Sequence, residues 1–289
     1  MQNGRNSVLS KLSAHINNVA LHHSVFALPF AYMGLFLAAR GIPSLHDFIW
    51  VTLAMVGARS SALAMDNIVD LKFDKIQPRM KKRPLVAGTV KPVEVVALII
   101  VSLALFLFSA AQLAPICLKL TPICLFFLLF YPYTKRFTFL CHYFLGMALA
   151  MAPAGGYMAV TGQLPLGIIF LSGGVCLWIG SFDVIYGSQD RAFDLKNGLH
   201  SMATRFGVAK AQRIAAYVHI VSIICFILTG IYFDLSWIYY IGVLIAVITL
   251  IYQHSLVSPH DFHRLTQVYF MRNGIVSIVI FIFTLVDLT

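Results

Sequence analysis

Long apolar segments alternate with short polar ones along this chain, and the pattern predicts membrane-spanning helices. Each apolar segment is about 20 residues long, enough for a helix to cross the hydrocarbon layer of a bilayer. Backbone N–H and C=O groups find no water there, so each span must form its own hydrogen bonds as a helix. The short alternating strands of a barrel are not evident. We therefore expect nine helices, over residues 20–39, 47–66, 92–111, 115–132, 140–160, 165–186, 213–232, 236–253 and 268–287.

The composition agrees with a polytopic all-α membrane protein. Of the 289 residues, 60% are hydrophobic and 11% are charged. The five cysteines lie in apolar segments without a CxxC pair, which indicates neither a disulfide framework nor a zinc site. We expect one integral-membrane domain over residues 1–289.

The basic residues predict the orientation of the chain, since short cytoplasmic loops carry an excess of Lys and Arg. All but four of the 21 Lys and Arg residues fall in the N-terminal segment and in every second loop after it. Arg40 and Lys119 fall on the other side, and Arg59 and Arg272 lie within spans. This places the N-terminus inside and the C-terminus outside, as expected for a bacterial plasma membrane. The net charge of +10 is thus an orientation signal, and nucleic acid is not an expected partner.

The acidic residues are few and concentrated. Six of the 11 lie in two short segments, "MDNIVDLKFDK" and "DVIYGSQDRAFD", each at the cytoplasmic end of an apolar span. In a helix, residues four apart share a face, so Asp70 and Asp74 point in one direction, as do Asp190 and Asp194. Carboxylates at a membrane boundary are costly, which favours a functional role. The alternative is that single Asp and Lys residues cap helices and anchor them at the headgroups.

The spacing suggests a site for Mg²⁺ and a diphosphate. Mg²⁺ prefers oxygen ligands and is often held by one or two carboxylates together with phosphate oxygens. Two facing acidic clusters could hold a pair of Mg²⁺ ions. Nearby bases fit the diphosphate, since arginine matches phosphate oxygens in pairs and lysine acts as a point charge.

The two acidic segments resemble the motifs of the UbiA superfamily of intramembrane prenyltransferases. The first motif of the family, N-D-x-x-D-x-x-x-D followed by R-x-x-x-R-P, corresponds to "DNIVDLKFDKIQPRMKKRP" at 66–84, with the leading pair in swapped order as Asp66-Asn67. The second motif, D-x-x-Y-x-x-x-D-x-x-x-D, corresponds to "DVIYGSQDRAFD", within a segment that runs over 183–207. A Y-x-x-x-K element matches as Tyr131 to Lys135. The resemblance covers nearly the whole chain.

The resemblance implies a reaction and a set of site residues. It implies Mg²⁺, two ions in number, and transfer of a polyprenyl group from polyprenyl diphosphate to a small aromatic acid, with the isoprenoid tail reaching the membrane lipid. The implied metal ligands are Asp66, Asp70, Asp74, Asp183, Asp190 and Asp194. The implied catalytic residues are Asp70, Asp74, Asp190, Asp194 and Tyr186, and the implied substrate-binding residues are Arg59, Asn67, Arg79, Arg83, Tyr131, Lys135, Arg136, Ser201 and Arg205.

The sequence leaves several alternatives open. The motif sequences are similar to those of the branch that prenylates 4-hydroxybenzoate for ubiquinone. The alternative acceptor is 1,4-dihydroxy-6-naphthoate, in a menaquinone pathway. A lipid-ether synthase of the same superfamily is a third reading. Arg59 either clamps the carboxylate of the acceptor or pairs with a motif aspartate. Outside enzymes, paired aspartates in a helical bundle could line the path of a cation or metabolite transporter.

Overall fold

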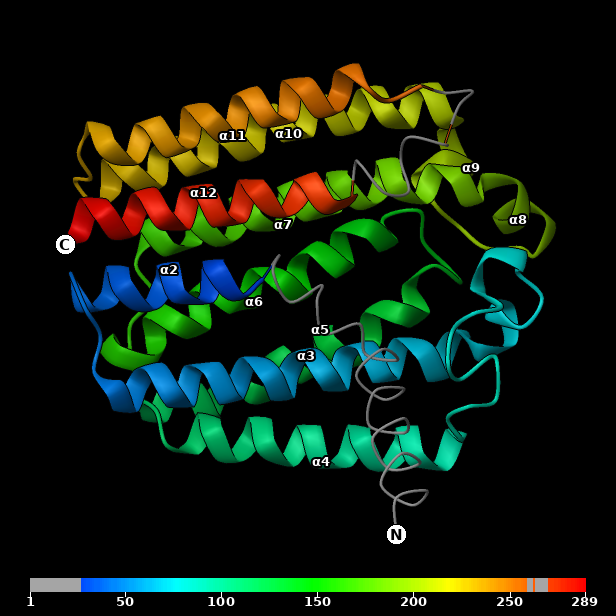
Figure 1. Ribbon diagram of the computed structural model, residues 1–289, viewed down its shortest axis with the longest axis horizontal. Helices are drawn as coiled ribbons and strands as arrows, with labels where there is room; N and C mark the ends of the chain where they lie inside the picture. Colours follow the sequence, from blue (N-terminus) through cyan, green and yellow to red (C-terminus); the bar gives the residue numbers. More distant parts are fainter. Residues whose placement is uncertain (1–26, 259–261, 263–269) are drawn as a thin grey trace, which may run out of the picture.

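The chain folds into a bundle of long helices that run along a common direction (Figure 1). The computed structural model describes residues 27–258, 262 and 270–289, and the secondary structure in this part of the chain is entirely helical. The elements are α2 (Leu28–Ala39), α3 (Leu45–Asp74), η2 (Pro78–Met80), α4 (Pro92–Ala111), α5 (Pro115–Thr134), α6 (Cys141–Thr161), α7 (Leu166–Gly187), η3 (Ser188–Asp190), α8 (Arg191–Lys196), α9 (Met202–Phe206), α10 (Val208–Tyr232), α11 (Trp237–Ser255) and α12 (Phe270–Leu288).

The helices confirm the all-α membrane fold. Within the described residues, 7 helices are long and apolar enough to cross a membrane, and two shorter apolar helices, α2 and α12, stand where the first and last spans are predicted. Residues 20–26 of the predicted span 20–39, and residues 268–269 of the predicted span 268–287, lie outside the described residues. The helix order along the chain is as expected.

One predicted boundary is wrong in an informative way. The second span is predicted over 47–66, but α3 continues to Asp74, two turns further. Hydropathy falls at the first aspartate, whereas backbone hydrogen bonding continues past it because the polar side chains of the last turns face a cavity inside the protein. The first acidic motif therefore lies on the helix itself.

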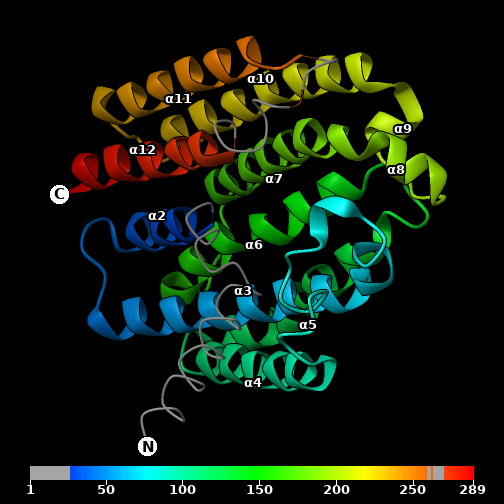
Figure 2. The same ribbon diagram turned by 45° about the vertical axis from the view of Figure 1, so that its right-hand side comes forward.

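The bundle is organised around α6 and α7. Figures 1 and 2 both show α3, α4 and α5 on one side of these helices and α10, α11 and α12 on the other. At its core, the buried ring of Phe30 lies 5.5 Å from that of Trp178 and 5.7 Å from that of Phe226 between ring centroids. These contacts join α2, α7 and α10 into one apolar core.

Small residues allow α2 and α6 to pack closely. A Cβ atom added at Gly156 would come within 2.1 Å of the Ala31 carbonyl oxygen, and one added at Gly34 within 2.1 Å of the Pro153 carbonyl oxygen. Close backbone contact through small residues is typical of helices packed in membranes. Other large apolar side chains, such as Ile100 and Ile220, point outward from the bundle and are exposed.

The polar connections gather at one end of the bundle. Helices α8 and α9 lie at this end together with the segment 75–91, and the C-terminus lies at the opposite end (Figure 1). The last turn of α3 and the last turn of α7 both reach this end, which brings the two acidic segments into one region.

Candidate active site

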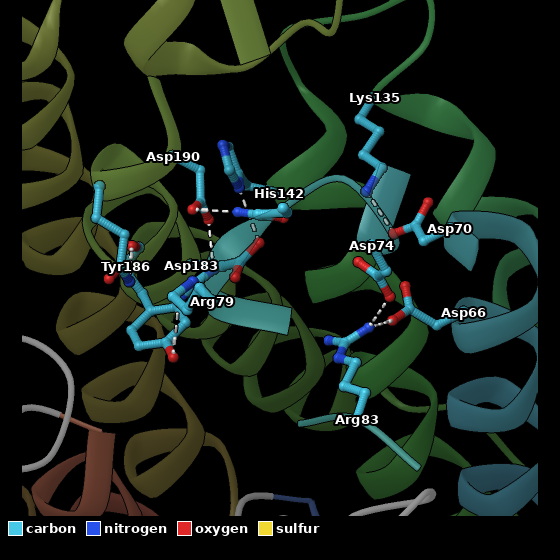
Figure 3. Close-up of polar contacts among 12 residues, drawn as sticks. Asp66, Asp70, Asp74, Arg79, Arg83, Lys135, His142, Asp183, Tyr186 and Asp190 are labelled. Atoms are coloured by element: carbon cyan, nitrogen blue, oxygen red, sulfur yellow. Dashed lines mark hydrogen bonds and ion pairs between the residues drawn. The ribbon is translucent and has the colours of Figure 1, made fainter. Parts of the chain in front are cut away.

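Carboxylates from the two acidic segments face one another across a polar cavity (Figure 3). Helix α3 carries three of them on one face because they are spaced by four residues. The second set is spread over three elements: Asp183 lies near the end of α7, Asp190 ends the 3-10 turn η3 that follows Gly187, and Asp194 lies on α8. The cavity has a volume of about 510 Å³, and six carboxylates line it: Asp66, Asp70, Asp74, Asp183, Asp190 and Asp194.

Basic side chains lie among these carboxylates and bond to them. Arg79 donates a hydrogen bond to Asp190 Oδ2 at 2.5 Å, and Arg83 donates one to Asp74 Oδ2 at 2.6 Å. Lys135, at the end of α5, donates one to Asp70 Oδ2. All three bases come from the predicted set, and they line the same cavity. The site therefore contains paired acidic and basic side chains and is not a purely acidic patch.

The acidic field keeps the bases protonated. Burial alone would lower the pKa of Arg83, but the negative charges of Asp66 and Asp74 outweigh it, so this pKa lies above its ordinary value. Burial would likewise lower the pKa of Lys135, and here Asp70 and Asp66 raise it above the ordinary value. Both side chains are thus cations at neutral pH, as phosphate binding requires.

Two further residues of the site were not among the sequence predictions. Gln77 donates from Nε2 to Asp190 Oδ1 at 2.7 Å, and His142 Nδ1 lies 2.8 Å from Asp183 Oδ2. Both side chains are buried and line the polar cavity. Gln77 is a variable position inside the motif segment 66–84 and His142 a polar residue within an apolar span, and such residues are too common to be selected without the fold.

The remaining predicted residues differ in how they relate to the cavity. Tyr131, Tyr186 and Ser201 line it, and the Tyr186 hydroxyl accepts a hydrogen bond from Arg79 at 3.2 Å. Asn67 lies just behind the lining and accepts from Arg83 at 3.2 Å.

Two predicted arginines lie on the outside of this end. Arg136 donates to the Val69 carbonyl oxygen at 2.7 Å and stacks its guanidinium on the rings of Phe73 and Tyr133. Arg205 is exposed on α9. The structure brings neither side chain to the lining of the polar cavity, and their role in binding substrate stays a prediction.

An apolar cavity of about 490 Å³ adjoins the polar one. It is lined by α3, α4, α5, α6 and α7, mostly by aliphatic side chains and glycines. Arg59 stands at the junction, seven residues before Asp66 on α3, which corresponds to roughly 10 Å along the helix. The two cavities share four lining residues: Arg59, Tyr131, Leu145 and Leu149.

The donor set fits a hard divalent cation completed by substrate oxygens. Oδ1 of Asp70 is buried and has no hydrogen-bond partner among the described residues, whereas Oδ2 receives Lys135. A buried carboxylate oxygen of this kind suits a Mg²⁺ ligand. Within the same part of the chain, no three His, Cys, Asp or Glu side chains come close enough to form a complete metal site. Mg²⁺ characteristically needs only one or two carboxylates when phosphate oxygens and water complete its shell.

The fold and this site define an integral membrane protein in which a cavity lined by charged side chains adjoins an apolar cavity. The sequence profile of the UbiA prenyltransferase family matches residues 27–275. The chain therefore belongs to the UbiA prenyltransferase family, and its activity is that of a prenyltransferase. This removes the transporter alternative.

Relatives and solved structures agree with that assignment. The chain is 32% identical to 4-hydroxybenzoate octaprenyltransferase of Vibrio campbellii, over 86% of this chain and 87% of that protein. It is 31% identical to the enzyme of the same name from Nitrosospira multiformis, over 86% and 85%. Among solved structures, the apo form of a UbiA homolog from Aeropyrum pernix K1 has a TM-score of 0.83 and 32% identity, over 93% of this chain and 98% of that one.

A more distant structure shares the fold. A UbiA homolog from Archaeoglobus fulgidus, bound to DMAPP and Mg²⁺, has a TM-score of 0.74 at 19% identity, over 95% of this chain and 98% of that one.

Proposed function

We propose that this chain transfers a polyprenyl group from polyprenyl diphosphate to 4-hydroxybenzoate in a Mg²⁺-dependent reaction. The observation that carries the proposal is the position of Arg59, between a site of facing acids and bases and an apolar cavity. The acceptor is named in the relatives, which are 4-hydroxybenzoate octaprenyltransferases. The DMAPP and Mg²⁺ bound to the Archaeoglobus fulgidus homolog support the same class of donor and metal.

The charged residues would bind the diphosphate end of the donor. The facing aspartates would hold Mg²⁺, two ions in number, and the metal would supply positive charge that stabilises the diphosphate as it leaves. Arg79, Arg83 and Lys135 line the same cavity and would turn from their carboxylates to the phosphate oxygens. The aspartates would then bind the metal and the bases the phosphate oxygens, in place of the acid–base pairs seen in the structure.

The apolar cavity would hold the isoprenoid tail. Its lining consists mostly of aliphatic side chains and glycines, so a hydrocarbon chain would leave few buried polar groups unsatisfied there. Tyr131 and Leu149 line both cavities, so the first carbon of the prenyl chain would lie near them, between the two. Substrate drawn from the lipid would thus place its polar end in the charged site and its tail among the helices.

Arg59 would orient the acceptor. A guanidinium binds a carboxylate with two parallel hydrogen bonds, which fixes the plane of the acid as well as its position. With its carboxylate at Arg59, a 4-hydroxybenzoate ring would extend toward the acidic end of α3, where the donor is ionised.

The reaction then requires one bond to break and one to form. The C–O bond of the donor ionises, its electron pair leaves with the diphosphate, and an allylic cation remains. A ring carbon beside the hydroxyl attacks this cation and forms the new C–C bond. Loss of the ring proton to the released diphosphate restores aromaticity. The aromatic face of Tyr186, which already holds the Arg79 guanidinium 5.4 Å from its ring centroid, would stabilise positive charge nearby.

We further propose that the polar end of the bundle faces the cytoplasm of a bacterial cell. The basic segment 75–91 and the bases of α8 and α9 lie at this end, in agreement with the excess of Lys and Arg expected on that side. The C-terminus would then be outside.

The test is a membrane assay with geranyl diphosphate, Mg²⁺ and either 4-hydroxybenzoate or 1,4-dihydroxy-6-naphthoate. We expect prenylated 4-hydroxybenzoate, and loss of product with a chelator or in Asp70→Ala and Asp190→Ala. Asp47→Ala, at the opposite end of α3, is the control and should keep activity. Prenylation of the naphthoate alone would assign the other acceptor, and binding of the diphosphate without either product would contradict an aromatic acid acceptor.

A further inference from the structure

Gln77 is held firmly at the edge of the polar cavity. It follows the last residue of α3 by three positions, and its backbone N–H points at the carbonyl oxygens of Phe73 and Asp74, 3.1 and 3.3 Å away. Its own carbonyl accepts from the Met80 N–H at 3.0 Å. The side chain is only 9% exposed and lines the cavity. The backbone of Gln77 is therefore fixed, and its buried side-chain amide has few alternative conformations.

The amide reaches across to the second acidic segment. Nε2 of Gln77 donates to Oδ1 of Asp190 at 2.7 Å, between residues 113 positions apart. Arg79, two residues further along, donates to the other oxygen of the same carboxylate, Oδ2, at 2.5 Å. Figure 3 shows Arg79 beside Asp190 and Tyr186. One short turn after α3 thus occupies both oxygens of Asp190.

The two donors differ in charge, and the difference matters for a metal ligand. The Arg79 guanidinium neutralises the carboxylate, so it competes with a metal cation for Oδ2. An amide N–H carries no net charge, so it can orient Oδ1 while leaving the negative charge of Asp190 available. Partners outside the metal shell that orient a ligand in this way commonly set metal affinity.

We propose that Gln77 is a positioning residue for prenyl transfer. By holding Oδ1 of Asp190, it keeps the carboxylate in place while Oδ2 passes from Arg79 to Mg²⁺ and Arg79 turns to the diphosphate. The inference rests on the function proposed above and deepens it, because Gln77 acts on the donor and metal end of the site through Asp190. The acceptor end, at Arg59, is untouched.

The experiment measures two binding constants in the same purified protein. Mg²⁺ is titrated calorimetrically in the presence of a geranyl diphosphate analogue whose bridging oxygen is sulfur, which resists ionisation. The affinity for 4-hydroxybenzoate is measured in the same samples. Gln77→Leu removes the amide, and Gln77→Glu keeps the length and volume of the side chain but replaces the N–H donor by an acceptor facing Asp190. Gln163→Leu, in the exposed connection between α6 and α7, is the matched control.

We expect Mg²⁺ to bind about 10- to 100-fold more weakly to Gln77→Leu, the usual effect of removing an outer partner of a metal ligand. Gln77→Glu should lose at least as much, while the affinity for 4-hydroxybenzoate and the behaviour of Gln163→Leu stay within about twofold of the unsubstituted protein.

Three results would overturn the inference. Undiminished Mg²⁺ binding in Gln77→Glu would show that the amide donor is not used. An equal loss of affinity for Mg²⁺ and for 4-hydroxybenzoate would show a general structural defect in place of a positioning role. If the unsubstituted protein bound neither Mg²⁺ nor the analogue, the proposed function itself would fall, an outcome distinct from the other two.

Discussion

Lys135 at the end of α5 donates a hydrogen bond to Oδ2 of Asp70, so a predicted phosphate-binding base and a predicted metal ligand neutralise one another. The pair joins two helices that are far apart in sequence. It also leaves Oδ1 of Asp70 buried and without a partner among the described residues. Binding of metal and binding of diphosphate should therefore be linked through this pair.

Replacing Lys135 should move the two affinities in opposite directions. In Lys135→Met, the diphosphate loses a cationic partner, and we expect about 10- to 100-fold weaker binding of prenyl diphosphate. Mg²⁺ alone should bind more tightly, because it no longer competes with an ammonium group for Asp70. Titrations of each ligand separately measure both effects. Lys135→Arg retains the charge and is the control; weaker binding of both ligands to Lys135→Met would contradict the exchange of partners.

Replacing Arg59 should affect the acceptor alone. We expect Arg59→Met to lower kcat/KM for 4-hydroxybenzoate by about 10- to 100-fold, the usual value of a hydrogen-bonded charge pair, and to leave the KM for geranyl diphosphate within about twofold. Arg59→Lys keeps the charge but loses the planar guanidinium, so its kcat/KM for 4-hydroxybenzoate should lie between those of Arg59→Met and the unsubstituted protein. Steady-state kinetics with each substrate varied in turn decide the matter. A rise only in the KM for geranyl diphosphate would instead indicate that Arg59 pairs with a motif aspartate and does not bind the acceptor.

Two neighbouring glycines of α6 should respond differently to the same substitution. A Cβ atom at Gly156 would collide with the backbone of α2, whereas one at Gly155 would meet nothing within 4 Å. We expect Gly156→Val to destabilise the fold by about 1–3 kcal/mol, because the rigid backbone of α2 must move. Gly155→Val should melt close to the unsubstituted protein. Thermal unfolding in detergent measures both, and equal melting temperatures would show that α2 and α6 do not pack this closely.

Two glycines of α6 and α7 that face the apolar cavity allow a test of whether it holds the isoprenoid tail. Gly155 and Gly173 both line the apolar cavity, and a Cβ atom on either meets nothing within 4 Å. Gly173→Leu should therefore fold but fill part of the cavity. We expect it to lower kcat/KM for a long polyprenyl diphosphate by at least tenfold while sparing dimethylallyl diphosphate, whose chain is short. A competition assay with both donors measures the ratio, and an unchanged ratio would place the tail elsewhere.

Much of the fold follows from local pattern. The predicted spans 92–111 and 165–186 correspond closely to α4 and α7, because a segment in lipid must form its own backbone hydrogen bonds and its hydropathy reveals its length. The spacing of Asp70 and Asp74 also predicts a common face, and in the structure both line the polar cavity together with Asp66. The predicted end of the second span, at residue 66, is wrong because hydropathy does not distinguish a loop from polar helical turns that face a cavity of the protein. Helix α3 continues to Asp74.

The class of this protein can be predicted from its sequence. Its apolar segments of about 20 residues require membrane helices, and its few aspartates, placed in two motifs, require a partner of positive charge. Which groups meet is visible only in the folded chain: Gln77 and Arg79 hold the two oxygens of Asp190, His142 lies against Asp183, and an apolar cavity adjoins the charged site. The physical reason is that periodicity records neighbours within a few residues, whereas these contacts join residues tens of positions apart and exist only once the helices have packed.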